Sequence, residues 1–131
     1  MATIIKEFVV DAPASKVWEA LRDFKAVHEK LVPGFVTHLR MKGDDRIITF
    51  ANGMTIKEVF VGSDDAAMRV AYSAVGELAS HHNASAQVFD LGKGRSRFVW
   101  ITDVLPNEVA KMIEPMMDQG AAVMKKTLEK K

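Results

Sequence analysis

The hydrophobic positions along this chain change period several times, and each period predicts a different element. Residues 4–10 are rich in β-branched side chains, which favours a strand. In residues 14–24, Val17, Trp18 and Leu21 recur at the spacing of one helical face. That segment therefore predicts an amphipathic helix.

Turn-forming residues mark the ends of this helix. Pro13 suits the first turn of a helix, and Asp11 is the side chain expected to cap it. A second, short helix is expected over residues 26–31. Pro33 and Gly34 end that helix and turn the chain.

From residue 35 the period falls to two, which is typical of half-buried strands. Six strands are expected: residues 35–42, 46–51, 54–61, 68–75, 80–91 and 96–105. Asn52-Gly53 predicts a type I′ hairpin, because both residues tolerate positive φ. Residues 62–65 and 92–94 predict the later turns.

A final helix is expected after Pro106, with Asn107 as its cap. Its apolar stripe keeps a period of 3.6 over about five turns and consists of Val109, Met112, Ile113, Met116, Met117, Val123, Met124 and Leu128. Pro115 lies within this stripe. Either it kinks or splits the helix, because it removes one intrahelical hydrogen bond, or it begins the main helix after a looser turn.

The order of these elements predicts the fold class. Consecutive hairpins give an antiparallel sheet, which must bury one face, and only the final helix is long enough to cover that face. We therefore expect an α+β architecture, with a curved sheet of about seven strands wrapped around a long C-terminal helix. A length of 131 residues fits one domain over residues 1–131.

The composition of the chain argues against several classes of function. Hydrophobic residues make up 48% and charged residues 27% of the chain, as in globular proteins. The net charge of +1 gives no long-range attraction to nucleic acid. The chain has no cysteine and no metal-ligand spacing of histidines with carboxylates, so neither a metal nor another cofactor is expected. No apolar run suits a membrane span or signal peptide, so we expect a cytoplasmic protein.

Three short segments carry a resemblance to a known family. They are Ala12-Pro13-Ala14-Ser15-Lys16-Val17-Trp18 after the first strand, Arg22-Asp23-Phe24 closing the first helix, and Trp100 ahead of Pro106 before the last helix. With the order of elements, the chain resembles the START-like superfamily, also called SRPBCC. Within it, the chain is most similar to the small bacterial polyketide cyclase/dehydrase-like proteins, over essentially its whole length.

The resemblance implies a fold and a pocket, and no mechanism. The fold is the helix-grip fold, with a cavity between sheet and long helix that holds lipids, aromatic polyketides, hormones or quinone-like molecules. Some members are enzymes, and many are carriers or regulators. The superfamily has no invariant catalytic motif to carry over to residues of this chain.

Seven residues are expected to line such a cavity. Methionine is unbranched and polarizable, so the methionines of the final helix would form a soft wall against a ligand, although an ordinary core stripe has the same pattern. Trp100 and Tyr72 are large rings with one polar atom each. The expected lining is Ile56, Tyr72, Phe98, Trp100, Met112, Met116 and Met117.

Four residues are candidates for acid–base or oxyanion chemistry in the same cavity: Arg40, Glu58, Tyr72 and His82. Simple alternation puts Glu58 on the apolar face of its strand with Ile56 and Phe60, where a buried carboxylate needs a partner. The alternative for Glu58 is a solvated edge. His81 and His82 point to opposite faces of a strand, so only one of them can face the cavity.

Three functions are compatible with this picture. A carrier or sensor of a small hydrophobic or aromatic molecule, such as a lipid, polyketide or quinone, would have an almost wholly apolar lining. A cyclase or dehydratase would have at least two polar groups within hydrogen-bond reach inside the cavity. A protein-interaction module, or one half of a homodimer, would have a collapsed cavity and an exposed apolar patch.

Overall fold

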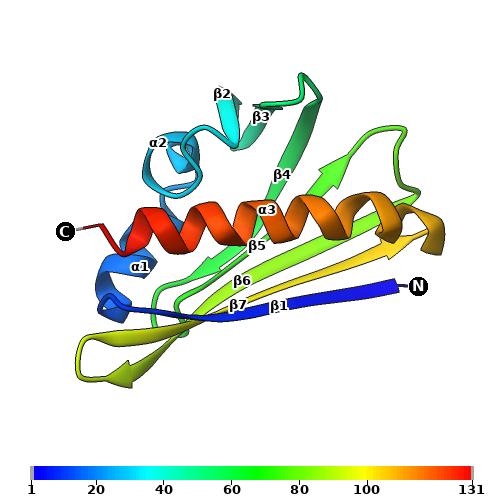
Figure 1. Ribbon diagram of the computed structural model, residues 1–131. Helices are drawn as coiled ribbons and strands as arrows, with labels where there is room; N and C mark the ends of the chain where they lie inside the picture. Colours follow the sequence, from blue (N-terminus) through cyan, green and yellow to red (C-terminus); the bar gives the residue numbers. More distant parts are fainter. Residues whose placement is uncertain (1, 131) are drawn as a thin grey trace.

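The computed structural model describes residues 2–130 and contains seven strands and three α-helices (Figure 1). The elements are β1 (Ala2–Val10), α1 (Ala14–Arg22), α2 (Val27–Lys30), β2 (Val36–Lys42), β3 (Asp45–Phe50), β4 (Thr55–Asp64), β5 (Arg69–Val75), β6 (His81–Gly92), β7 (Arg95–Leu105), a 3-10 turn η1 (Asn107–Val109) and α3 (Ala110–Leu128).

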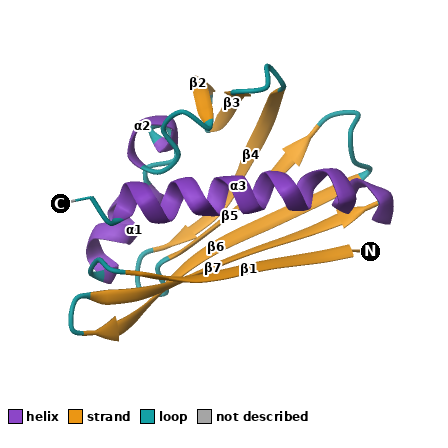
Figure 2. Cartoon of the chain, in the orientation of Figure 1, coloured by secondary structure: helices purple, strands orange, loops and turns teal. Residues whose placement is uncertain are grey.

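All seven strands belong to one curved antiparallel sheet. Its order is β1-β7-β6-β5-β4-β3-β2, so every pair of neighbours from β2 to β7 is a hairpin. Only β1 pairs out of sequence order, antiparallel to β7. The helices lie on one side of the sheet, and α3 runs across that face (Figure 2). This is the predicted α+β helix-grip architecture.

The core lies where α1 and the C-terminal half of α3 meet the sheet. Val10, Val17 and Phe98 are fully buried there, and Met124 and Leu128 of α3 join the same cluster. The Trp18 indole anchors α1, because its Nε1 donates a hydrogen bond of 2.9 Å to Asp65 Oδ1.

Gly120 lets α3 approach the sheet closely. A Cβ atom at this position would lie 3.3 Å from ring atoms of both Phe35 and Trp100. The helix can therefore rest directly on the Trp100 indole, since glycine presents no side chain there.

Several local expectations were wrong at the ends of elements. Neither Asp11 nor Asn107 caps a helix with its side chain: Pro13 precedes α1, and Asn107 is the first residue of η1. In each case proline fixes an extended residue just before the first turn. The Asp11 amide instead donates to Glu129 Oε2 at 2.8 Å, which ties the chain before α1 to the end of α3.

The turn expected at residues 62–65 lies further along. Strand β4 continues to Asp64 because a bulge between Phe60 and Gly62 absorbs one extra residue. The chain then turns before Met68, which has a φ of 52°. A glycine inside a strand often marks such a bulge. Gly62 therefore indicated the bulge, but the prediction from alternation did not take it into account.

The Asn52-Gly53 hairpin forms, but it is not a type I′ turn. The Phe50 amide donates to the Met54 carbonyl at 2.8 Å, which leaves a three-residue loop. Only Gly53 in this loop has positive φ, at 88°, while Asn52 accepts a hydrogen bond from the Met54 amide through its side chain. A three-residue loop with glycine in the left-handed position is the next commonest hairpin connection.

Pro115 neither splits nor begins the last helix. Helix α3 is continuous from Ala110 to Leu128 and contains Pro115. Proline removes one intrahelical donor, and the remaining turns and the packing of the buried face keep the helix intact.

Candidate functional site

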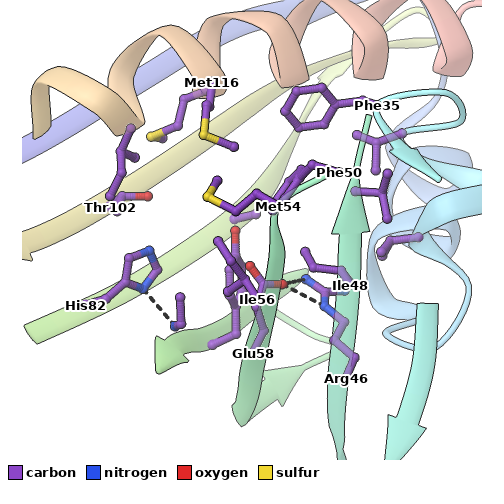
Figure 3. Close-up of a pocket in the computed structure, with 18 of the residues that line it drawn as sticks. Phe35, Arg46, Ile48, Phe50, Met54, Ile56, Glu58, His82, Thr102 and Met116 are labelled. Carbon is purple, nitrogen blue, oxygen red and sulfur yellow. Dashed lines mark hydrogen bonds and ion pairs between the residues drawn. The ribbon is translucent and has the colours of Figure 1, made fainter. Parts of the chain in front are cut away.

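An internal pocket of about 340 Å³ lies between the sheet and the helices. Its walls come from strands β2 to β7, from α1 and α2, and from α3 between Ile113 and Met124. Most of the lining is aliphatic, aromatic or methionine, as Figure 3 shows for Ile48, Phe50 and Met116. The volume falls at the small end of the range typical of ligand pockets in proteins.

The exposure of the lining residues locates the mouth. Val70 and Met117 are almost fully buried and belong to the deep wall. Thr55, Val75 and Leu78 also line the pocket but are exposed. The pocket therefore opens between the start of β4, the β5–β6 loop and the N-terminal half of α3.

A buried ion pair, Arg46 with Glu58, lies in the otherwise apolar wall (Figure 3). Arg46 donates to Glu58 Oε1 from Nε at 2.8 Å and approaches the same oxygen from Nη2 at 2.7 Å. Its Nη1 donates to the Phe24 carbonyl at 3.1 Å. The guanidinium carbon lies 3.8 Å from the centre of the Phe24 ring and 5.2 Å from that of Tyr72. Arg46 is thus enclosed by protein partners.

Only one oxygen of the Glu58 carboxylate takes part in this ion pair. Both Arg46 contacts go to Oε1, and no protein donor within residues 2–130 bonds to Oε2. Glu58 is 8% exposed, so it is not the solvated edge residue of the alternative interpretation. Its second oxygen remains as a hydrogen-bond acceptor at the pocket wall.

Tyr72 and Trp100 form a second polar contact inside the pocket. The Trp100 indole Nε1 donates to the Tyr72 hydroxyl oxygen at 2.9 Å. Burial, and to a lesser degree the charge of Glu58, raises the pKa of Tyr72 far above its ordinary value. Tyr72 therefore stays protonated near neutral pH and can donate its own hydrogen, but it cannot serve as a base.

His82 faces the pocket in a defined tautomer. Its Nδ1 accepts a hydrogen bond of 2.9 Å from the Ala74 amide, so the neutral ring carries its proton on Nε2. Burial lowers the pKa of His82, although the charge of Glu58 works in the opposite direction. His82 is therefore neutral at physiological pH and presents its Nε2–H group to the pocket. Its expected acid–base role stays a prediction.

The lowered pKa gives His82 a measurable effect on stability. The stabilisation from the neutral ring is fully present above the ordinary histidine pKa of 6.5 and is lost as the pH falls through the lower pKa of the folded protein. As the pH is lowered from about 7 to about 5, we expect the free energy of unfolding to decrease more for wild type than for His82→Asn. Urea unfolding at each pH measures this. His81→Asn, on the exposed side of the strand, should follow wild type, and identical profiles for all three proteins would contradict the buried neutral ring.

The structure brings seven of the expected residues to the pocket: Ile56, Glu58, Tyr72, His82, Trp100, Met116 and Met117. His81 is exposed, as strand alternation requires.

Three expected residues lie elsewhere. Arg40 is exposed on β2, opposite Ile47, because its strand position faces away from α3. Phe98 shares the face of Trp100 but lies further along β7, where it is fully buried and stacks on Phe8 with ring centres 5.0 Å apart. Met112, in the first turn of α3, is 47% exposed and does not line the pocket, whereas its neighbour Ile113 does.

Sequence reasoning missed Arg46, the partner of Glu58. The signal was available, since Arg46, Ile48 and Phe50 alternate on one face of β3, as Glu58 and Ile56 do on β4. A charged residue in an inward-facing register is the pattern that selected Glu58, and it applies equally to Arg46.

Among the described residues, no group of three or more histidines, aspartates or glutamates is placed to hold a metal ion. No helix in that part of the chain is both long and apolar enough to cross a membrane.

Solved structures share this fold. The XoxI protein of Bacillus cereus has 16% identity and a TM-score of 0.86, covering 98% of this chain and 96% of that one. A protein of Thermobifida fusca has 25% identity and a TM-score of 0.77, covering 98% and 91%. Norcoclaurine synthase of Thalictrum flavum, in complex with dopamine and hydroxybenzaldehyde, has 23% identity and a TM-score of 0.75, covering 98% and 84%.

The sequence itself matches a family profile along almost its full length. No protein of curated function matches the chain significantly. The profile described as "Polyketide cyclase / dehydrase and lipid transport" matches residues 1–129. This chain therefore belongs to the polyketide cyclase/dehydrase and lipid transport family, within the START-like (SRPBCC) superfamily.

Proposed function

We propose that this chain binds a small hydrophobic or aromatic molecule in the pocket and acts as a cytoplasmic carrier or sensor. The observation that carries the proposal is the 340 Å³ pocket with a largely apolar lining. The family description, which includes lipid transport, agrees with it. Burying on the order of 200 Å² of apolar ligand surface would contribute roughly 5 kcal/mol at 25 cal/mol per Å², enough for a useful affinity.

Two measurements test the binding function. Native mass spectrometry of gently purified protein should reveal a bound small molecule. The neutral dye N-phenyl-1-naphthylamine, which fluoresces in apolar surroundings, should bind saturably at one site per chain. Absence of both a bound compound and saturable dye binding would refute the proposal.

Met116 and Met112 provide a matched pair on one helix. Met116 lines the mouth and is half-buried, whereas Met112, one turn earlier, is exposed and does not line the pocket. We expect Met116→Lys to weaken dye binding by about tenfold or more, because a charge at the mouth must be desolvated when the ligand enters. Met112→Lys should bind the dye like wild type. Equal losses in the two variants, measured by fluorescence titration, would mean that the mouth lies elsewhere.

A second candidate is an enzyme of the cyclase or dehydratase type. The specific observation in its favour is the Arg46–Glu58 pair, which places an acceptor oxygen in an apolar pocket. An enzyme should convert the molecule that it binds. If so, mass spectrometry should find a different compound bound to Glu58→Gln than to wild type, whereas a carrier should retain the same compound in both.

The interaction-module alternative required a collapsed cavity. The pocket is open, so that requirement is not met. A homodimer stays a prediction, and size-exclusion chromatography with light scattering would test it.

A further inference from the structure

Four neighbouring strands place Arg46, Glu58, Ala74 and His82 in one row across the sheet. Arg46 on β3 is opposite Glu58 on β4, and Glu58 is opposite Ala74 on β5. The Ala74 amide in turn donates to the His82 ring on β6. Figure 3 shows this order, with His82 on one side of Glu58 and Arg46 on the other.

Ala74 leaves a gap in this row. Glu58 and His82 are two strands apart, so their backbones are separated by about 10 Å. The residue between them contributes only a methyl group, and all three line the pocket. The space above Ala74 is therefore flanked by the carboxylate on one side and the imidazole on the other.

The two flanking groups have complementary unused atoms. Glu58 Oε2 accepts hydrogen bonds and has no donor within residues 2–130. His82 Nε2 carries a proton because Nδ1 is engaged by the Ala74 amide. A group that both donates and accepts would satisfy the two atoms together, and a hydroxyl is the smallest such group.

We propose that the gap above Ala74 binds the hydroxyl group of an uncharged ligand, which donates to Glu58 Oε2 and accepts from His82 Nε2. This subsite rests on the proposed binding function and specifies the ligand class as an apolar body with a buried hydroxyl, such as a phenol or hydroxylated ring. The pocket thereby discriminates against carboxylates, including fatty acids.

We expect the pocket to exclude ligand carboxylates because the positive charge of Arg46 is already neutralised. Its charge is already paired with Glu58, its Nη1 donates to the Phe24 carbonyl, and the Phe24 ring covers one face of the guanidinium. A ligand carboxylate would therefore meet the carboxylate of Glu58 without a free cation. Like charges in an apolar site repel strongly because little water screens them.

Three probes with the same ring system test the subsite in wild type: naphthalene, 2-naphthol and 2-naphthoate, each titrated against bound N-phenyl-1-naphthylamine. We expect 2-naphthol to bind about tenfold more tightly than naphthalene, as two hydrogen bonds in a buried site allow. We expect 2-naphthoate to bind more weakly than naphthalene by about tenfold or more. Tighter binding of 2-naphthoate than of 2-naphthol would overturn the proposal.

Variants assign the preference to these two residues. His82→Asn keeps an acceptor for the Ala74 amide but removes the ring donor, so the 2-naphthol preference over naphthalene should fall to about threefold or less. His81→Asn, exposed on the same strand, should keep the wild-type preference. Glu58→Gln leaves Arg46 with an unneutralised charge, so 2-naphthoate should then bind better than naphthalene. If Glu58→Gln does not fold, the wild-type series and the histidine pair still decide the question.

The outcomes separate this subsite from the function on which it rests. If neither the dye nor any naphthalene probe binds, the proposed binding function fails and the subsite fails with it. If dye and naphthalene bind but 2-naphthol has no advantage, the pocket binds ligands and the hydroxyl subsite alone is refuted.

Discussion

Arg46→Met is expected to lower the free energy of unfolding by about 3–5 kcal/mol. Arg46 is 7% and Glu58 8% exposed, and the hydrogen bond from Nε and the ion-pair contact from Nη2 go to the same carboxylate oxygen. Removing the guanidinium leaves a buried carboxylate without its partner, which costs far more than the net contribution of an exposed pair. Urea denaturation followed by tryptophan fluorescence measures the change.

Two further variants distinguish loss of the pair from loss of packing. The double variant Arg46→Met with Glu58→Leu removes both charges, so its stability should return to within about 2 kcal/mol of wild type. Lys57→Met breaks a more exposed contact of 3.7 Å to Asp45 and should cost less than about 1 kcal/mol. A cost below about 1 kcal/mol for Arg46→Met alone would show that water reaches Glu58 freely.

Ala86→Phe is expected to reduce dye affinity by more than about tenfold while leaving the protein folded. Ala86 is buried on β6 and lines the pocket, so the added ring can occupy the 340 Å³ of empty space without displacing protein atoms. The ring then takes the volume that a ligand needs. Fluorescence titration with N-phenyl-1-naphthylamine, paired with thermal unfolding, measures both effects.

Ala84 is the matched control for this substitution. It lies two residues earlier on the same face of β6, is 1% exposed and belongs to the packed core rather than to the pocket lining. Ala84→Phe has no space to fill and should lower the unfolding free energy by about 1–3 kcal/mol. If Ala86→Phe destabilises the protein as much as Ala84→Phe and leaves dye binding intact, the cavity is not the ligand site.

The agreement between sequence and structure is best for features set by local periodicity. The alternation in residues 96–105 correctly put Trp100 and Thr102 on the inward face of β7. It could not tell that Phe98, on the same face, would be covered by Phe8 of β1. Face follows from the pleat, whereas position relative to the cavity depends on a strand from the other end of the chain.

The polar part of the site shows the same division. Alternation marked Glu58 as an inward carboxylate, but the choice of Arg40 over Arg46 was wrong, because only the β3–β4 register sets Arg46 opposite Glu58. The tautomer of the His82 ring could not be predicted from the sequence either. It is fixed by the Ala74 amide, and no residue pattern reveals this contact between the neighbouring strands β5 and β6.

The sequence by itself determined the order of strands and helices, the antiparallel sheet and the family, because periodicity, turn residues and short motifs are local properties of the chain. The tertiary structure alone decided where the sheet and α3 separate, and hence which residues line the pocket. It also paired Arg46 with Glu58 and Tyr72 with Trp100, residues 12 and 28 positions apart. Such contacts depend on register, on sheet curvature and on the rotation of α3, which are set by the packing of the whole chain.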